Sequence, residues 1–356
     1  MASPLDRAHS FCARFGLKLP IVLAPLAGAC PPSLSIAVAN AGSMGACGAL
    51  LMQPPEILKW AADFRAGSSG PFQINLWIPD LPPVRDPEHE ERVRIFLSRF
   101  GPPVPPEAAD ARPPDFAAQC ESILEARPSV VSSVMGCYPP ELVARFQEAR
   151  IPWFSTATTL AEAKQAQSAG ADAIVVQGME AGGHRGCTDP EKAEAQLVGL
   201  FSLVPIVADA VRVPVIATGG IADARGVAAA LALGASAVAI GTGFLRCPEA
   251  RIAPAWADAL SRTAPEDTRV TRAFSGRTGR SIATAYVHAA SAPDAPLPCP
   301  YPVQRAITAL MRGQAQRENS IDGIQAWAGQ SALLAKALPA GELVGELWDE
   351  AKLLLR

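Results

Sequence analysis

A repeating pattern of short apolar runs and helical stretches extends through the chain up to residue 240. Eight apolar runs recur roughly every two dozen residues, and each is followed by a stretch of helical character. The runs cover residues 21–26, 44–49, 72–77, 129–135, 152–155, 173–177, 214–218 and 237–240. Runs this rich in apolar and β-branched residues are typical of strands buried on both faces of a parallel sheet. Eight such units predict an α/β chain that closes into a TIM (β/α)8 barrel.

The rest of the chain predicts a smaller, mainly helical lid domain. Apolar residues make up 49% of the 356 residues, which is enough for a large buried core. We expect residues 1–262 with 321–356 to form the barrel and residues 263–320 to form the lid segment over one barrel end. Prolines gather at residues 79–114, which marks an irregular insert between two barrel units. The pattern assigns this insert no role.

Charge and cysteine usage exclude several kinds of partner. The formal net charge is −3 with both signs interspersed, so no basic stripe is available for nucleic acid. The first residues lack the apolar core of a signal peptide, and no apolar run is long enough to cross a membrane, so the cytoplasm is the expected compartment. None of the eight cysteines has C-x-x-C spacing, so free thiols and no metal site are expected. The oligomeric state is not predicted.

The segment after the sixth run is the candidate reactive loop. Residues 177–186 read Gln-Gly-Met-Glu-Ala-Gly-Gly-His-Arg-Gly, and glycines let the backbone approach a ligand closely. Catalytic groups of a barrel gather at the C-terminal ends of its strands, so we expect His184 to be a catalytic acid-base group. Arg185 beside it would hold an anion or be solvated, two equally weighted alternatives. Glu180 is interpreted as a structural carboxylate rather than a second acid, and Cys187 as a buried thiol rather than a nucleophile.

Glycines at the ends of the last two predicted strands indicate a phosphate site. Gly219 and Gly220 follow the seventh run, and Gly241 and Thr242 follow the eighth. A barrel of this kind commonly binds phosphate there through backbone N–H groups. Asn75 and Gln177 end two further strands and could bind the edge of a planar ring. Taken together, these residues favour a cofactor with a ring and a phosphate.

These motifs resemble those of the nitronate monooxygenases, formerly called 2-nitropropane dioxygenases, which are FMN-dependent barrels with a lid domain. The resemblance covers nearly the whole chain, and its most specific part is Glu-Ala-Gly-Gly-His-Arg-Gly at residues 180–186. Other matching motifs lie at residues 24–28, 75–76, 217–221, 240–242, 274–277, 301–302 and 327–330. One departure is Leu26, where the first motif of the family usually has methionine.

The resemblance also implies roles for individual residues. His184 would be the catalytic base, and His184 and Tyr301 would line the substrate site. FMN would contact Ala24, Pro25, Asn75, Gln177, Gly182, Gly183, Gly219, Gly220, Ile240, Gly241 and Thr242, with Gln330 returning to the flavin from the segment after the lid.

The activity that the resemblance implies is oxidation of alkyl nitronates, for example propionate 3-nitronate, with O₂ to a carbonyl compound and nitrite. One alternative is an NAD(P)H-dependent FMN reductase of the same barrel family, acting on quinones or enoyl groups. Another is a barrel that binds FMN or another phosphate without turnover. The sequence specifies neither the physiological nitronate nor the use of NAD(P)H.

Overall fold

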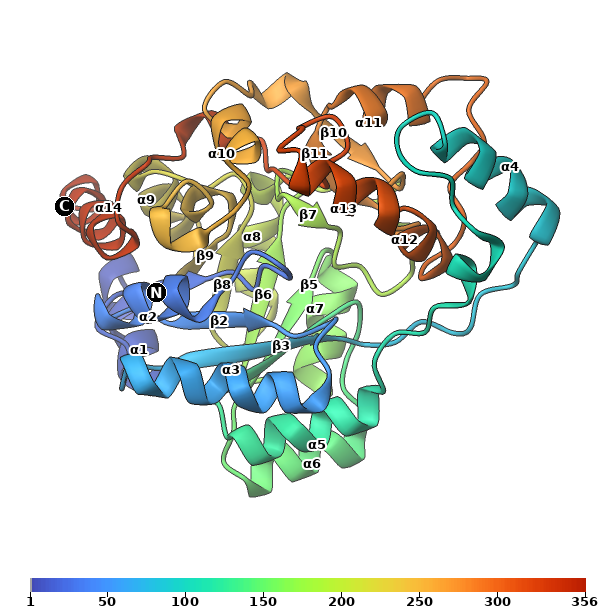
Figure 1. Cartoon of the computed structure of the whole chain (residues 1–356). Coiled ribbons are helices and arrows are strands. Elements are labelled where there is room, and N and C mark those ends of the chain that lie inside the picture. The colour runs from blue at the N-terminus through green and yellow to red at the C-terminus, as the bar shows by residue number, and fades with distance from the viewer. Residues whose placement is uncertain (1) are drawn as a thin grey trace.

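The computed structural model describes residues 2–356 and contains an eight-stranded parallel barrel with a lid across one end (Figure 1). Neighbouring strands follow the order β1-β9-β8-β6-β5-β4-β3-β2. The barrel closes where Leu23 N–H donates to Met44 O at 2.9 Å, beside a parallel bridge between Val22 and Met44. The predicted TIM barrel is therefore confirmed. Its strands are β1 Ile21–Leu23, β2 Gly45–Gly48, β3 Phe72–Trp77, β4 Val130–Val134, β5 Trp153–Ala157, β6 Ala173–Gln177, β8 Val215–Thr218 and β9 Ala237–Ile240.

Helices on the outside of the barrel begin at clear sequence signals. Proline occupies the first turn of several of them, where its missing N–H leaves no bond unmade. Thr159 and Glu162 form a capping box at the start of α7. The helices are α1 Pro4–Phe15, α2 Pro32–Asn40, α3 Pro54–Gly67, α5 Phe116–Ala126, α6 Pro140–Glu148, α7 Leu160–Ser168, α8 Leu200–Ala210, α9 Ala224–Ala232 and α14 Ala340–Leu354. Helix α14 packs against α2 and α9, so the C-terminal segment returns to the barrel after the lid.

One predicted helix is misplaced along the chain. The pattern of residues 190–203 predicts a helix, but residues 190–195 form turns and α8 begins only at Leu200. Pro205 lies inside α8 and removes a backbone hydrogen bond there. Leu203, Val204 and Val207 are buried on the barrel side of α8, and this burial outweighs the penalty of the proline.

The lid combines short helices with a three-stranded antiparallel sheet. The sheet has the order β10-β11-β7, from β10 Thr268–Thr271, β11 Gly279–Ile282 and β7 Gly183–His184. The lid helices are α10 Pro254–Leu260, α11 Ala285–Ala290, α12 Val303–Ile307 and α13 Ala309–Arg317. Strand β7 comes from the barrel loop after β6, so the sheet joins the two parts of the molecule.

The proline-rich insert packs on the lid. It contains α4 Pro87–Leu97 and the short 3₁₀ helix η1 Pro106–Asp110, and Figure 1 shows α4 beside the lid helices, away from the barrel. Val93 and Leu97 of the insert share a hydrophobic cluster with Phe274 and Tyr286 of the lid. Arg277 Nε also donates to Asp80 Oδ2 at 2.8 Å. The insert therefore braces the lid from its outer side.

Among residues 2–356, no helix has both the length and the hydropathy that a membrane span requires.

Candidate active site

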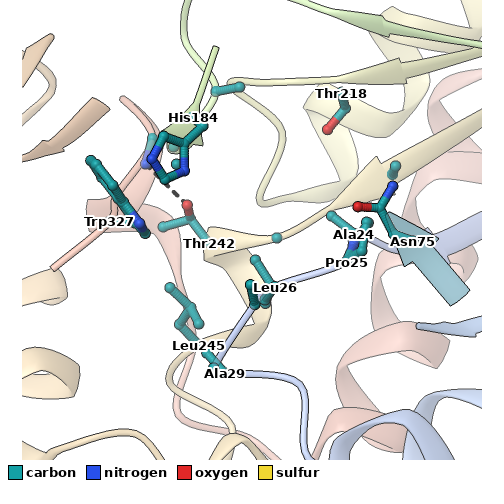
Figure 2. Close-up of a pocket in the computed structure, with 18 of the residues that line it drawn as sticks. Ala24, Pro25, Leu26, Ala29, Asn75, His184, Thr218, Thr242, Leu245 and Trp327 are labelled. Carbon is teal, nitrogen blue, oxygen red and sulfur yellow. Dashed lines mark hydrogen bonds between the residues drawn. The ribbon is translucent and has the colours of Figure 1, made fainter. Parts of the chain in front are cut away.

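A cavity of about 340 Å³ lies at the C-terminal ends of the barrel strands, beneath the lid. Figure 2 shows His184 and Trp327 on one side of it and Ala24, Pro25 and Asn75 on the other. Its walls contain three arginines and no aspartate or glutamate. The cavity therefore has a positive potential and favours an anionic ligand.

Eleven of the fourteen residues predicted for the site line this cavity. They are Ala24, Pro25, Asn75, Gln177, Gly182, Gly183, His184, Gly219, Gly220, Gly241 and Thr242. The other three lie just behind the wall. Ile240 is buried in the barrel core, and Gln330 uses its N–H to bond Glu180 O at 2.9 Å. The Tyr301 ring packs on Trp77, with their ring centres 5.4 Å apart.

His184 is held by a strand pairing. It lies opposite Gly279 of β11, and the next residue donates its N–H to Thr278 O at 2.9 Å. The Gln177 amide spans the loop, because its nitrogen donates to His184 O at 3.0 Å and its oxygen accepts from Gly186 N–H at 2.8 Å. The loop is therefore fixed to the barrel through Gln177 and to the lid through β11.

The His184 ring has one polar partner and two aromatic ones. Its Nε2 lies 2.7 Å from Ser275 Oγ, and the centres of Trp77 and Trp327 lie 4.6 Å and 4.7 Å from its own. Burial, and to a smaller extent the charges of Arg305 and Arg277, lower the pKa of His184 to about 3. The imidazole is therefore neutral near pH 7. Its Nδ1 has no hydrogen bond within residues 2–356.

The glycine end of the cavity requires glycine for steric reasons. Gly219 and Gly220 have φ values of +114° and +66°, a region that side chains rarely adopt. A Cβ on Gly182 would lie 2.4 Å from Gly329 N. Gly329 N–H also donates to Thr242 Oγ1 at 3.0 Å, so the loop after β6, the turn after β9 and the segment after the lid meet at one point.

Three neighbouring residues of the loop are structural. Arg185 is buried and donates to the carbonyls of Gln177, Thr158 and Gln196, so both alternatives for it, an anion ligand and a solvated side chain, were wrong. The Glu180 carboxylate accepts from Leu200 N–H and caps α8. Burial raises the pKa of the Cys187 thiol, which leaves it a poor nucleophile.

Sequence reasoning missed the side chains that surround His184. Trp77 ends β3, and its position at a strand terminus was an available signal. Ser275 and Trp327 lie in two of the motifs that carry the resemblance, yet no role followed from the motifs. Arg305 lies on α12, which begins directly after the Tyr301-Pro302 motif, and nothing in the motif indicated its role.

Known proteins resemble this chain over nearly its whole length. A nitronate monooxygenase from Paraburkholderia phytofirmans is 38% identical over 343 residues, which cover 95% of this chain and 93% of that protein. One from Pseudomonas aeruginosa is 35% identical over 348 residues, which cover 96% and 99%. The solved structure of a nitroalkane oxidase from Streptomyces ansochromogenes has a TM-score of 0.88 at 33% identity and covers 97% of this chain and 100% of that chain. FabK from Thermotoga maritima has a TM-score of 0.74 at 26% identity, covering 97% and 96%.

The family model described as nitronate monooxygenase matches residues 10–350. Since this match spans nearly the whole chain and agrees with both relatives, the chain belongs to the nitronate monooxygenase family.

Proposed function

We propose that the protein oxidises alkyl nitronates with O₂, using bound FMN, to a carbonyl compound and nitrite. The observation that carries this proposal is a neutral His184 on the wall of a cavity with three arginines and no carboxylates. An anionic nitronate fits such a cavity, because it meets positive charge and no negative side chain.

The chain's residues fit FMN at the strand ends. The short 3₁₀ helix η2 Thr242–Phe244 follows β9 directly, and no side chain caps its N-terminal N–H groups. Together with Gly219 and Gly220 it would hold the phosphate. Asn75 Nδ2 is bonded to Ser132 Oγ at 3.0 Å, which leaves the Asn75 amide oxygen available to the ring edge. FMN would supply the electron-transfer chemistry, which no protein side chain can replace.

The protein's own groups would bind the substrate and handle its proton. Trp77 and Trp327 shield the His184 ring from water on two sides. Nδ1 of His184 is the free ring nitrogen and would accept a proton from a neutral nitroalkane. A base whose pKa is about 3 is weak, so we expect preformed nitronates to react much faster than neutral nitroalkanes.

The test is direct. The purified protein should be yellow, and with butyl 1-nitronate it should consume O₂ and release nitrite in step. His184→Asn should reduce kcat/KM roughly 100-fold on neutral 1-nitrobutane and much less on its nitronate. A colourless protein that binds no added FMN, or a flavoprotein that releases no nitrite, would contradict the proposal.

Similarity to FabK supports one second candidate, a flavin reductase that uses NAD(P)H. Anaerobic mixing with NADH or NADPH separates the two. Rapid bleaching of the flavin would support the reductase, and an unchanged spectrum that bleaches on addition of nitronate would support the monooxygenase.

A further inference from the structure

Two arginines of the lid enter the cavity without a carboxylate partner. Arg305 on α12 and Arg312 on α13 both line it, and both are half-buried. The guanidinium of Arg305 makes no hydrogen bond or ion pair with any other part of residues 2–356. Arg312 donates only to neutral oxygens: to Thr308 Oγ1 at 3.2 Å, to Gln325 Oε1 at 3.4 Å and to Arg305 O at 2.9 Å.

The two charges are close enough to disfavour each other. Burial and, to a smaller extent, the charge of Arg305 lower the pKa of Arg312 to about 10. Burial also lowers the pKa of Arg305. Adjacent like charges in a partly desolvated wall destabilise the fold unless an anion compensates them. Asp80, an acidic side chain of the insert, cannot supply that anion, because it is already paired with Arg277.

Two uncharged donors that line the cavity also lack acceptors. The Gln325 amide nitrogen and the Trp256 indole nitrogen are buried and have no hydrogen-bond partner within residues 2–356. Both residues line the cavity. A buried donor without an acceptor costs about 1–3 kcal/mol, and the Gln325 side chain already contacts Arg312 through its amide oxygen.

We propose that Arg305 and Arg312, with the free amide N–H groups of Gln325, form an oxyanion subsite on the lid side of the cavity. Its two arginines lie on the lid helices α12 and α13, whereas the glycines that would hold the FMN phosphate follow barrel strands. The inference rests on the proposed function, because it assumes that a nitronate binds in the same cavity beside this subsite. Its occupant is a planar oxyanion, which arginine binds through two parallel N–H groups. That oxyanion is either a carboxylate at the far end of the substrate or a free ion such as the product nitrite.

Kinetics with two nitronates test the subsite. Propionate 3-nitronate carries a terminal carboxylate, and butyl 1-nitronate has an uncharged tail. Arg305→Gln should lower kcat/KM for propionate 3-nitronate roughly 10- to 100-fold and change that for butyl 1-nitronate less than about threefold. Arg305→Lys, which keeps the charge, should recover part of the loss. Arg305 is the cleaner target because its side chain makes no bond whose loss would disturb the lid.

A matched control and a binding measurement complete the test. Arg317→Gln removes the same charge from an exposed position on α13 and should leave both substrates unaffected. Calorimetric titration of the FMN-loaded enzyme with sodium propionate, and separately with sodium nitrite, measures free oxyanions. Suppose that Arg305→Gln abolishes oxyanion binding but leaves the ratio of kcat/KM for propionate 3-nitronate to that for butyl 1-nitronate unchanged. This result would assign the subsite to a free ion. A changed ratio would assign it to the substrate carboxylate.

Unchanged ratios in Arg305→Gln and Arg312→Gln, together with unchanged oxyanion binding, would overturn the proposal. Failure of the proposed function gives a different result, because butyl 1-nitronate would then yield no nitrite with the wild-type enzyme while the titrations would still report on the subsite.

Discussion

Ser275 determines which nitrogen of His184 is free to accept a proton. Its Oγ lies 2.7 Å from His184 Nε2, donates to Arg277 O at 3.2 Å and accepts from Arg277 N–H at 3.3 Å. The hydroxyl has one proton, and all these bonds form together only if that proton goes to Arg277 O. Nε2 must then carry the ring proton and donate to Ser275, which leaves Nδ1 as the acceptor.

Replacing Ser275 by alanine should therefore disturb the tautomer of His184 without removing the ring. We expect Ser275→Ala to lower kcat/KM for neutral 1-nitrobutane about tenfold and that for butyl 1-nitronate less than twofold. Ser275→Thr, which keeps the hydroxyl, should recover activity. Ser281→Ala removes a buried hydroxyl of the lid that does not contact His184 and is the matched control. Equal losses on both substrates would show that Ser275 is merely structural.

The low pKa of His184 predicts an unusual pH dependence. The folded-state pKa is about 3, below the ordinary value of 6.5. Between these two values the unfolded chain binds a proton that the folded chain does not, so stability should fall as the pH drops from about 6.5 toward 3. We expect wild type to lose about 2 kcal/mol more stability than His184→Asn between pH 7 and pH 5, measured by urea unfolding of both proteins. Parallel losses in the two proteins would place the His184 pKa near its ordinary value.

At the scale of elements, the position of His184 depends on the pairing of β7 with β11. A Cβ on Gly279 would lie 2.9 Å from Gly183 O and 3.0 Å from the Trp327 ring. Gly279→Ala should therefore push β7 and Trp327 apart and reduce kcat/KM for nitronate at least tenfold. Gly345→Ala on α14 places a Cβ in open space and should leave activity unchanged. An unchanged kcat/KM in Gly279→Ala would show that the position of the His184 loop does not depend on its pairing with the lid sheet.

The elements that the sequence predicts well are those whose pattern is local. Residues 173–177 and 237–240 coincide with β6 and β9, because strands buried on both faces are mostly apolar and these two end at Gln177 and before Gly241; residues 72–77 coincide with β3. Helix α8 was misplaced because its burial outweighs Pro205, and burial is a property of the tertiary structure. Strand β7 has two residues and exists only through β11, so no pattern within residues 177–186 could reveal it.

In the candidate site, too, the sequence predicts some features and not others. Glycine positions and His184 were predictable, since each follows a strand end and strand ends of a barrel converge. The environment of His184 was not, because Trp77, Ser275 and Trp327 are far apart in the sequence and meet only when the lid closes over the barrel. The pKa of His184 follows from that enclosure, so the sequence alone could not show whether the histidine is a strong or a weak base.

At the scale of the whole molecule, the insert at residues 79–114 holds the lid in place from outside. Asp80 pairs with Arg277, whose side chain is 2% exposed and also donates to Cys187 O at 3.2 Å. Asp80→Asn would leave a buried guanidinium without its counter-charge and should destabilise the protein by about 2 kcal/mol. Asp110→Asn removes an exposed partner of Arg85 and should cost less than about 1 kcal/mol. Chemical denaturation of the two variants compares them, and equal costs would contradict the bracing role of the insert.

Removing FMN should loosen the lid more than the barrel. Residues that would contact the cofactor come from the strand ends, from the loop carrying β7 and, through the Gly329–Thr242 bond, from the segment after the lid. A ligand that binds only the assembled arrangement stabilises it, so its loss should populate open states of the lid. Hydrogen exchange of β10 and β11 is expected to rise at least tenfold in the apoprotein, while exchange in β3 and β4 stays within about twofold. Uniform acceleration across the chain would instead indicate that FMN stabilises the barrel as a whole and that the lid closes without it.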